Sequence, residues 1–328
     1  MKRLADSPAN SSFSDSFEAA FAAGVKACNF QASPLQRIED PWLEPYQIEL
    51  WLKRDDLLHP IISGNKWRKL KYALRHALAL GCDTLISMGG AYSNHLHALA
   101  FAGSQFNLNT QAFVRGELVS PLNPTLQDLH DWGMQLEFVS RSEYRQLRLY
   151  QDWNALPKLQ AGHYWLPEGG AGTYAQQGVA ELLDEITLKF DSLCVACGTG
   201  ATLAGLLTKK PSSAKVIGFA ALKNAGFLNS DVARMSANAE GNDWEINHAY
   251  HFGGFAEVND ELLMFMHRFE TLTSIALDPL YTGKMLFGVY DLIAQGYFKK
   301  GQRIIAIHTG GLQGRRSGIL AQCGSGGV

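Results

Sequence analysis

The chain reads LCVACGTGATLAGLL at residues 193–207. The run 193–197 is apolar throughout, the glycine-rich turn 198–202 follows it, and a segment of small and apolar residues opens at Thr202. A strand that turns through glycines into a helix is the repeating unit of parallel sheets covered by helices. Ligands of such sheets bind where strands end and helices begin. This stretch therefore predicts an α/β fold and marks a first candidate site.

The same order of strand and helix recurs on both sides of this stretch. Before it we expect pairs at 47–53 and 65–80, 84–88 and 93–103, 111–115 and 124–132, and 135–139 and 142–153; after it we expect strands at 216–220 and 303–308 and helices at 259–271 and 283–295. With 328 residues, the chain exceeds what one hydrophobic core usually serves. The predicted fold class is α/β, with two open, twisted, mainly parallel sheets and helices on both faces.

Composition and charge favour a small-molecule partner. The chain is 46% hydrophobic and 18% charged, which is typical of an ordinary globular protein. Lys and Arg number 29 against 31 Asp and Glu. The formal net charge of -2 therefore gives the chain no overall positive charge to attract nucleic acid or an anionic membrane. We therefore predict a small-molecule substrate, no nucleic acid partner and no membrane partner.

The cysteines and the lack of long apolar runs bear on location. Five cysteines form an odd set without the spacing of a disulfide scaffold, so we expect a reducing compartment and no disulfides. We find no signal peptide at the start of the chain and no apolar run long enough to span a bilayer. The predicted location is cytoplasmic.

Residues 63–70, SGNKWRKL, put Lys66 in the first turn of a predicted helix. The positive end of the helix dipole disfavours a cation there. A desolvated lysine beside other cations has a lowered pKa and becomes a nucleophile able to form a Schiff base. Lys66 is the candidate for that chemistry; taken alone, a solvated surface lysine is the alternative interpretation.

The glycine turn 198–202, GTGAT, is a candidate phosphate site. Successive backbone amides there can surround an anion, and two threonine hydroxyls add donors. A dinucleotide-binding loop is the rival interpretation, but Leu203 stands at the third glycine position and 220–222 reads AAL, without the expected acid. A turn that needs glycine only for its backbone geometry also stays open.

The turn 89–95, GGAYSNH, joins another predicted strand to another predicted helix. Ser93 can cap that helix. Together with free helix amides, the side chains of Ser93, Asn94 and His95 can hold a substrate carboxylate. We interpret His97 as helix surface or core, because no carboxylate or cysteine accompanies it at the spacing of a metal site.

Two further loops carry polar residues at the ends of predicted elements. They are 278–284, DPLYTGK, and 308–311, HTGG. Tyr281 and Thr309 are the candidates there, with a core aromatic and a strand-ending threonine as the alternatives. Cys194 and Cys197 have CxxC spacing, but no second pair accompanies them, so we predict neither a metal site nor a redox role.

These five motifs, in this order, resemble those of the D-cysteine desulfhydrase and 1-aminocyclopropane-1-carboxylate deaminase family. That family has the tryptophan synthase β-like fold (fold type II) and uses pyridoxal 5'-phosphate. The resemblance covers roughly residues 45–315. It implies a homodimer whose large cofactor-binding domain comprises residues 1–66 and 167–328 and whose small domain comprises 67–166, with the active site in the cleft between them.

The resemblance also implies roles for the matching residues. Lys66 would form the Schiff base with the cofactor, Asn94 would bond its ring hydroxyl, and Thr309 would meet its pyridine nitrogen. The cofactor phosphate would be held by Gly198, Thr199, Gly200, Ala201 and Thr202. The substrate carboxylate would be bound by Ser93, Asn94 and His95. Tyr281 would lie beside ring and substrate, and the catalytic residues would be Lys66, Ser93 and Tyr281.

The substrate follows from the same resemblance. Thr282 matches the desulfhydrase pattern, since deaminases that open the cyclopropane ring carry glutamate there. We predict a pyridoxal phosphate-dependent lyase or deaminase of a small amino acid, with D-cysteine giving a 2-oxo acid, ammonia and sulfide. A 1-aminocyclopropane-1-carboxylate deaminase is the alternative, and a nucleotide-binding or non-catalytic relative is a more distant one. Tyr92 and His97 depart from the family, which usually has glutamine and arginine at these positions.

Overall fold

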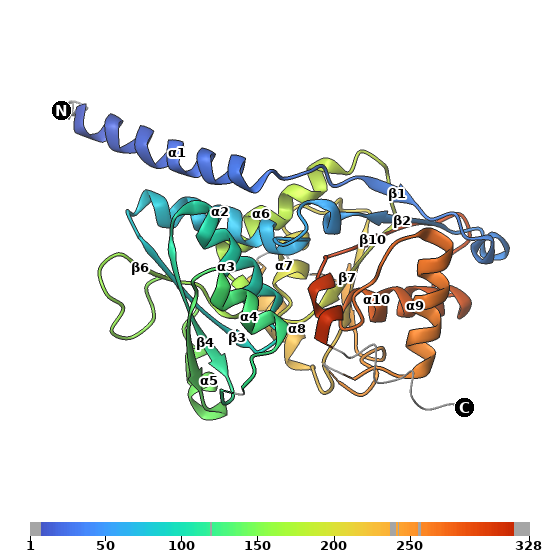
Figure 1. Cartoon of the computed structure of the whole chain (residues 1–328). Helices are drawn as coiled ribbons and strands as arrows, with labels where there is room; N and C mark the ends of the chain where they lie inside the picture. The colour runs from blue at the N-terminus through green and yellow to red at the C-terminus, as the bar shows by residue number, and fades with distance from the viewer. Residues whose placement is uncertain (1–7, 119, 237–240, 242, 255–256, 318–328) are drawn as a thin grey trace.

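Two sheets form the framework of the protein (Figure 1). The computed structural model describes residues 8–118, 120–236, 241, 243–254 and 257–317. Within those ranges, the six-stranded sheet has the order β1 (Leu35–Arg37), β2 (Glu49–Lys53), β10 (Arg303–Ile307), β7 (Ser192–Cys197), β8 (Lys215–Ala220) and β9 (Trp244–Asn247). The four-stranded sheet has the order β5 (Gln135–Val139), β4 (Asn109–Arg115), β3 (Thr84–Gly90) and β6 (His163–Trp165). All neighbouring strands are parallel except β1, which pairs antiparallel with β2.

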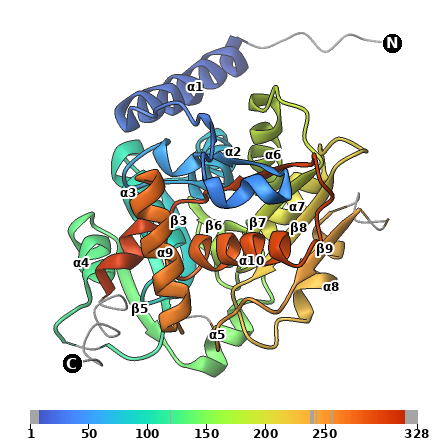
Figure 2. The ribbon, with the colours of Figure 1, turned by 90° about the vertical axis from the view of Figure 1, so that its right-hand side faces the viewer.

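Helices cover both faces of these sheets (Figure 2). The α-helices are α1 (Pro8–Cys28), α2 (Asn65–Ala79), α3 (Asn94–Phe106), α4 (Pro124–Asp131), α5 (Arg141–Leu147), α6 (Thr173–Ala180), α7 (Ala201–Leu207), α8 (Phe227–Met235), α9 (Asp260–Thr273) and α10 (Thr282–Ala294). Short 3-10 helices are η1 (Pro41–Tyr46), η2 (Asp55–Leu57), η3 (Glu168–Gly170), η4 (Glu181–Glu185) and η5 (Leu312–Ser317). This architecture confirms the predicted α/β class with two mainly parallel sheets.

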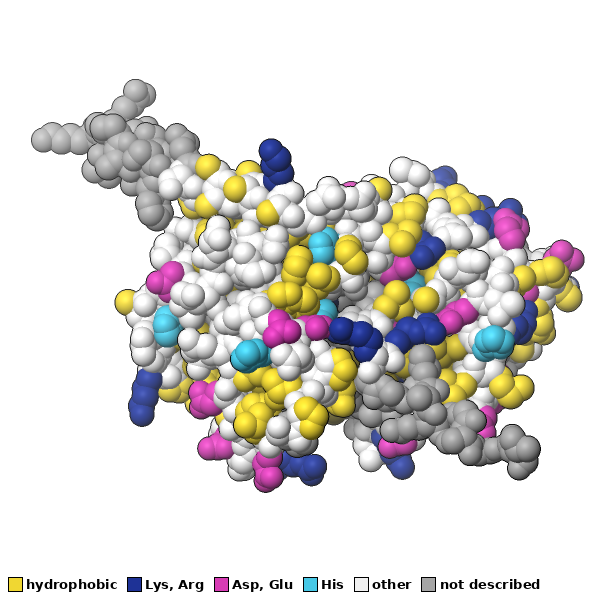
Figure 3. Space-filling model, viewed as in Figure 1, with side chains coloured by type: hydrophobic (Ala, Val, Ile, Leu, Met, Phe, Trp, Pro, Cys, Tyr) yellow, Lys and Arg dark blue, Asp and Glu magenta, His cyan; other side chains and the backbone are white. Residues whose placement is uncertain are grey.

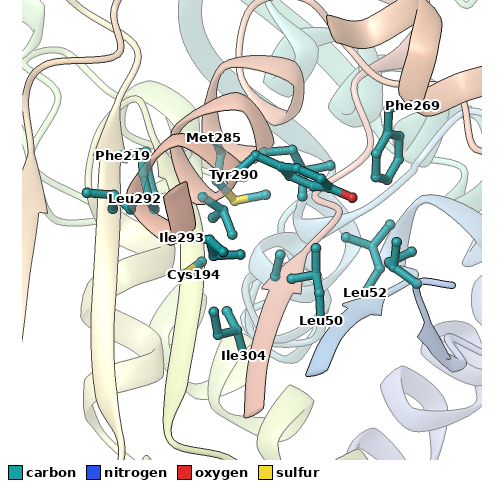
Figure 4. Close-up of a cluster of buried hydrophobic side chains, with 14 of the residues drawn as sticks. Leu50, Leu52, Cys194, Phe219, Phe269, Met285, Tyr290, Leu292, Ile293 and Ile304 are labelled. Atoms are coloured by element: carbon teal, nitrogen blue, oxygen red, sulfur yellow. The ribbon is translucent and has the colours of Figure 1, made fainter. Parts of the chain in front are cut away.

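The core of the six-stranded sheet explains why its strands are apolar throughout. Every residue of β7 is buried, because α10 packs on one face of the sheet and α7 on the other. On the first face, side chains of the strands meet those of α9 and α10 (Figure 4). The residues drawn there include Leu50, Leu52, Cys194, Ile304, Phe269, Met285, Tyr290 and Ile293. A strand covered on both faces loses the alternation of polar and apolar residues.

The four-stranded sheet is also covered on both faces. Leu85, Ala112 and Val114 pack in one cluster with α2 and α3. Ile86 and Met88, which alternate with Leu85 along β3, pack on the opposite side beside the α5 residue Tyr144. All strands of this sheet fall within residues 84–165, and those of the other sheet fall outside that range. The domain division at 1–66, 67–166 and 167–328 stays a prediction.

Most predicted elements are present, with differences at ends and in short segments. The predicted helix 142–153 ends at Leu147, because the following chain bonds to β6 instead: Trp165 donates from its indole to the carbonyl of Tyr150 and from its backbone to that of Trp153. The sequence interpretation missed α1, β1, β6, α6, α8 and β9. The three-residue strands β1 and β6 are too short to show a period.

Helix α1 crosses the outside of α2 and α3 and extends past them (Figure 1). Its contact with α3 is close, since a Cβ at Gly24 would lie 2.4 Å from the ring of Phe106. Neither α1 nor any other helix in the described ranges combines the length and apolarity needed to cross a bilayer. Basic and acidic side chains are interspersed on the face seen in Figure 3, in keeping with the near-balanced charge of the chain.

Candidate active site

A cavity of about 630 Å³ lies where the carboxyl ends of strands from both sheets meet. Its walls come from the segments that follow β3, β4, β7 and β10 and from the start of α2. The predicted site residues that line it are Lys66, Ser93, Asn94, His95, Gly198, Thr199, Gly200, Thr202, Tyr281 and Thr309. Ala201 is fully buried at the start of α7 and does not line the cavity. The fold thus brings together loops that are more than 200 residues apart in the chain.

Lys66 lies in the first turn of α2, beside the loop that follows β10. Gly64 has a φ of 63°, and a Cβ built on it would lie 1.7 Å from the carbonyl oxygen of Thr309. Loss of hydration lowers the pKa of Lys66 to about 8, although the charge of Asp278 opposes that shift. A larger share of the Lys66 amine is therefore neutral and nucleophilic near neutral pH than for an ordinary lysine.

A buried ion-pair network holds the start of α2. Arg68 donates from Nε and Nη2 to the two carboxylate oxygens of Asp55, at 2.6 and 2.7 Å. It also bonds Glu185, which receives a further bond from the fully buried Lys53. The backbone of Gly64 donates to the carbonyl of Asp55 at 2.8 Å. These bonds orient the turn that carries Lys66.

The glycine turn after β7 contributes Gly198, Thr199, Gly200 and Thr202 to the cavity wall. Gly200 has a φ of 76°, which favours glycine, and a Cβ at Gly198 would lie 3.1 Å from the ring of Tyr281. Asn65 donates to Oγ1 of Thr202 at 2.7 Å. Because Thr202 accepts this bond, its own hydroxyl proton remains available to a ligand.

Ser93 caps α3 as predicted, with its hydroxyl oxygen accepting from the backbone of Leu96 at 3.2 Å. The neighbouring His95 is buried and lies 2.8 Å from Ser87 through Nε2. Ser87 already donates its proton to the carbonyl of Leu166, so it must accept from Nε2–H of His95. Burial and the charges of Lys66 and Lys69 keep the pKa of His95 well below its usual value, so Nδ1 carries no proton.

The turn before α10 is built around a buried carboxylate. Asp278 accepts from the backbone amides of Leu280, Tyr281 and Thr282, and burial raises its pKa. Burial and the charge of Asp278 also raise the pKa of Tyr281, so its phenol stays protonated. Thr282 accepts from the backbone amide of Asp278 at 2.9 Å and does not line the cavity.

Several cavity residues escaped the sequence interpretation. Lys69 is 4% exposed, lines the cavity one turn after Lys66, and forms no side-chain hydrogen bond among the described residues. Burial and the charge of Lys66 hold its pKa well below the usual value. Gln313 donates to Oδ1 of Asn94. The remaining charged residues on the wall are Arg115, Arg141, Arg148 and Glu168. The available signal for Arg115 and Arg141 was their position at the carboxyl ends of the predicted strands 111–115 and 135–139.

Two other predictions concern residues outside the cavity. His97 is buried, as expected for a core histidine, and its Nε2 lies 2.9 Å from Asp128 of α4. Asp128 also forms an ion pair with Arg316 of η5, which links α4 to the C-terminal segment of the described chain. Cys194 and Cys197 are buried in β7, and burial raises the pKa of Cys197 to about 12. Both are therefore unreactive thiols near neutral pH.

Comparison with known proteins identifies the family. The family model described as pyridoxal-phosphate dependent enzyme matches residues 31–310. A bifunctional D-cysteine desulfhydrase/1-aminocyclopropane-1-carboxylate deaminase of Arabidopsis thaliana is 32% identical over 86% of this chain and 77% of its own. A protein of Pyrococcus horikoshii, named as a candidate 1-aminocyclopropane-1-carboxylate deaminase, is 30% identical over 84% of this chain and 91% of its own. The crystal structure of an ACC deaminase homologue matches with a TM-score of 0.75 and 26% identity, covering 92% of this chain and 98% of that one. The chain therefore belongs to the pyridoxal-phosphate dependent enzymes of tryptophan synthase β-like fold, and pyridoxal 5'-phosphate is its cofactor.

Proposed function

We propose that this enzyme removes the amino group of a small amino acid by elimination, releasing a 2-oxo acid and ammonia, and that D-cysteine, which also yields sulfide, is a substrate. The observation that carries this proposal is the position of Lys66. Its amine, with a pKa of about 8, shares one cavity with the glycine turn 198–202 and with the Ser93 loop. A nucleophilic amine is thus combined with separate sites for a phosphate and for a carboxylate.

The residues of the cavity fit pyridoxal phosphate. When bound, this cofactor supplies an aldehyde for an amine to attack and a ring that withdraws electrons from the bound amino acid. Lys66 would carry the aldehyde carbon. Thr199, Thr202 and the amides around Gly200 would hold the phosphate, and the buried side chain of Lys69 lies on the same cavity wall. Asn94 would bond the ring hydroxyl, and Thr309 would face the ring nitrogen.

The substrate side of the cavity contains hydrogen-bond donors and a proton acceptor. The hydroxyl of Ser93, the amide of Asn94 and the backbone amide of His95 would bind the α-carboxylate. The side chain of His95 offers only an acceptor at Nδ1, since Nε2–H is bound to Ser87. The amine of Lys66 would be the base that takes the α-proton. Tyr281 stays protonated, so its hydroxyl would donate a hydrogen bond within the cavity.

The choice of D-cysteine rests on position 282. Thr282 is fully buried and holds the turn at Asp278, so it brings no carboxylate to the cavity. Eliminating a thiolate, which is a good leaving group, requires less electron withdrawal by the cofactor ring than breaking an unactivated carbon–carbon bond. The alternative, 1-aminocyclopropane-1-carboxylate deamination, is supported by its frequency in the names of the relatives.

The test is a side-by-side assay of 2-oxo acid release from D-cysteine, L-cysteine, D-serine, β-chloro-D-alanine and 1-aminocyclopropane-1-carboxylate. We expect D-cysteine to react faster than the cyclopropane compound. Faster turnover of the cyclopropane compound would select the deaminase alternative. A cofactor-loaded enzyme that turns over none of the five compounds would refute the proposal.

Three further parts of the proposal concern the whole molecule. We propose a homodimer in the cytoplasm, with residues 1–66 and 167–328 as the large domain and 67–166 as the small one. Light scattering of the purified enzyme checks the first part. Limited proteolysis that releases a folded 67–166 fragment would support the proposed boundaries.

A further inference from the structure

The charge of the cavity differs sharply from that of the chain. The whole sequence has 29 Lys and Arg against 31 Asp and Glu. The Lys, Arg, Asp and Glu residues that line the cavity are Lys66, Lys69, Arg115, Arg141, Arg148 and Glu168. Five of these six are basic side chains, and the three arginines among them keep their charge at any pH the protein meets. A cleft lined by one sign of charge concentrates ligands of the opposite sign.

The two lysines and the three arginines lie on different elements. Lys66 and Lys69 are on α2, at the cofactor end of the cavity. Arg115 ends β4, Arg141 begins α5 directly after β5, and Arg148 follows α5. In the sheet register, Arg115 pairs with Gly90 of β3 on one side and with Val139 of β5 on the other. The arginines therefore extend the strand-end edge that begins with the Ser93 loop.

The arginine group is held by a partly buried scaffold. The guanidinium of Arg115 lies 5.4 Å from the ring centre of the buried Tyr144. The hydroxyl of Tyr144 donates to Glu168 at 2.6 Å, and Nε of Arg148 forms an ion pair with the same carboxylate at 2.8 Å. Glu168 thus neutralises Arg148. Arg115 and Arg141 have no carboxylate partner among the residues that the structure describes.

We propose that Arg115 and Arg141 bind a second anionic group on the substrate side chain, namely a carboxylate or a phosphate-type oxyanion. This inference rests on the proposed function and specifies its substrate class. The other anions already have sites: the cofactor phosphate has the glycine turn and the α-carboxylate has the Ser93 loop. D-cysteine would then contain only the reacting end of the preferred substrate. Guanidinium groups suit this role because they form paired, charge-assisted hydrogen bonds with planar oxyanions.

Isosteric ligands of different charge test the proposal. Cofactor-loaded enzyme is titrated with the D- and L-forms of aspartate and asparagine, and binding is measured from the change in cofactor absorbance and by calorimetry. We expect aspartate to bind about tenfold tighter than asparagine, or more, and salt to reduce the difference. The double variant Arg115→Gln/Arg141→Gln should bind the two equally. Arg145→Gln is the matched control, since Arg145 is exposed on α5 but does not line the cavity.

A turnover assay provides the second arm. O-phosphoserine and serine of the same hand are compared by kcat/KM for 2-oxo acid release, which separates a phosphate preference from a carboxylate preference. Equal binding of aspartate and asparagine together with equal turnover of this pair, by an enzyme that still turns over D-cysteine, would overturn the inference and leave the proposed function intact. An enzyme that binds no amino acid at all would overturn both. Melting curves of the variants should match the wild type.

Discussion

The carbonyl oxygen of Thr309 occupies the space that a side chain at Gly64 would need, because a Cβ there would lie 1.7 Å from that oxygen. The contact joins the turn that carries Lys66 to the loop after β10. Gly64 also has a φ of 63°, so a substitution meets both backbone strain and overlap with backbone atoms. The turn that carries Lys66 can therefore approach Thr309 this closely only because residue 64 is glycine.

Gly64→Ala should displace the Lys66 turn. We expect a loss of unfolding free energy of about 2 kcal/mol or more and loss of cofactor retention, because backbone atoms cannot rotate out of the way as a side chain can. Gly296→Ala is the control, since Gly296 has a φ of 74° and nothing within 4 Å of a Cβ, so only the strain of about 1 kcal/mol applies. Urea unfolding of both variants measures the difference. Equal losses would mean that the Thr309 contact is unimportant.

Lys66→Ala should leave the fold intact and abolish turnover, because alanine is favourable in a helical turn and no other amine replaces this one. Burial also lowers the pKa of Lys284 to about 8, but its ammonium donates to the carbonyls of His251 and Gly254 outside the cavity. Borohydride reduction followed by peptide mapping should find the cofactor on Lys66. A label on Lys53, Lys69 or Lys284 would contradict the assignment.

The rate at which the apoenzyme captures pyridoxal phosphate should depend on pH through Lys66. Burial disfavours the charged amine and lowers its pKa to about 8, so the reactive neutral form increases with pH and saturates above that value. We expect the rate to rise about tenfold per pH unit below pH 8 and then to level. Stopped-flow absorbance measures it, with free lysine as the reference amine. A rate that keeps rising to pH 10 would show an ordinary lysine.

Thr202→Val should weaken cofactor binding by about 1–2 kcal/mol, because valine has a similar shape but no hydroxyl to donate to the phosphate. The substitution also leaves the amide of Asn65 without its acceptor, which stands at 2.7 Å in the wild type. Thr208→Val is the control, since its hydroxyl donates to the carbonyl of Gly205 away from the cavity. Titration of the two apoenzymes with the cofactor compares them. Unchanged affinity in Thr202→Val would limit the glycine turn to a backbone role.

His95 should be neutral at pH 7, with its proton on Nε2, because Ser87 can only accept from it and nearby lysine charges oppose a second proton. Nitrogen chemical shifts of labelled histidine report this tautomer, and a proton on Nδ1 would contradict it. His95→Gln can keep the bond to Ser87 while losing the acceptor at Nδ1. We expect amino acid binding to change little in His95→Gln, because the carboxylate would meet the backbone amide of residue 95, and His97→Gln, outside the cavity, is the control.

Local patterns in the sequence were enough to predict most of the strand, turn and helix units and the loops that carry Lys66, Ser93, the glycine turn and Thr309. Apolar runs, glycines and helix caps act through neighbouring residues, so their effect can be read along the chain. The same patterns did not predict the end of α5 or the strand β6, because Tyr150 and Trp153 bond across to Trp165.

The tertiary structure alone decided which charged residues share the cavity. Arg115 and Arg141 stand on separate units, and they meet near the Ser93 loop only because β5, β4 and β3 are neighbours in the sheet. Lys69 became a cavity residue because packing of α2 buried it beside Lys66. Burial and the distance between remote residues are set by the packing of whole elements, which no local pattern contains. The sequence by itself therefore determined the fold class and singled out Lys66 as the candidate nucleophile, and the packing determined which charged residues surround it.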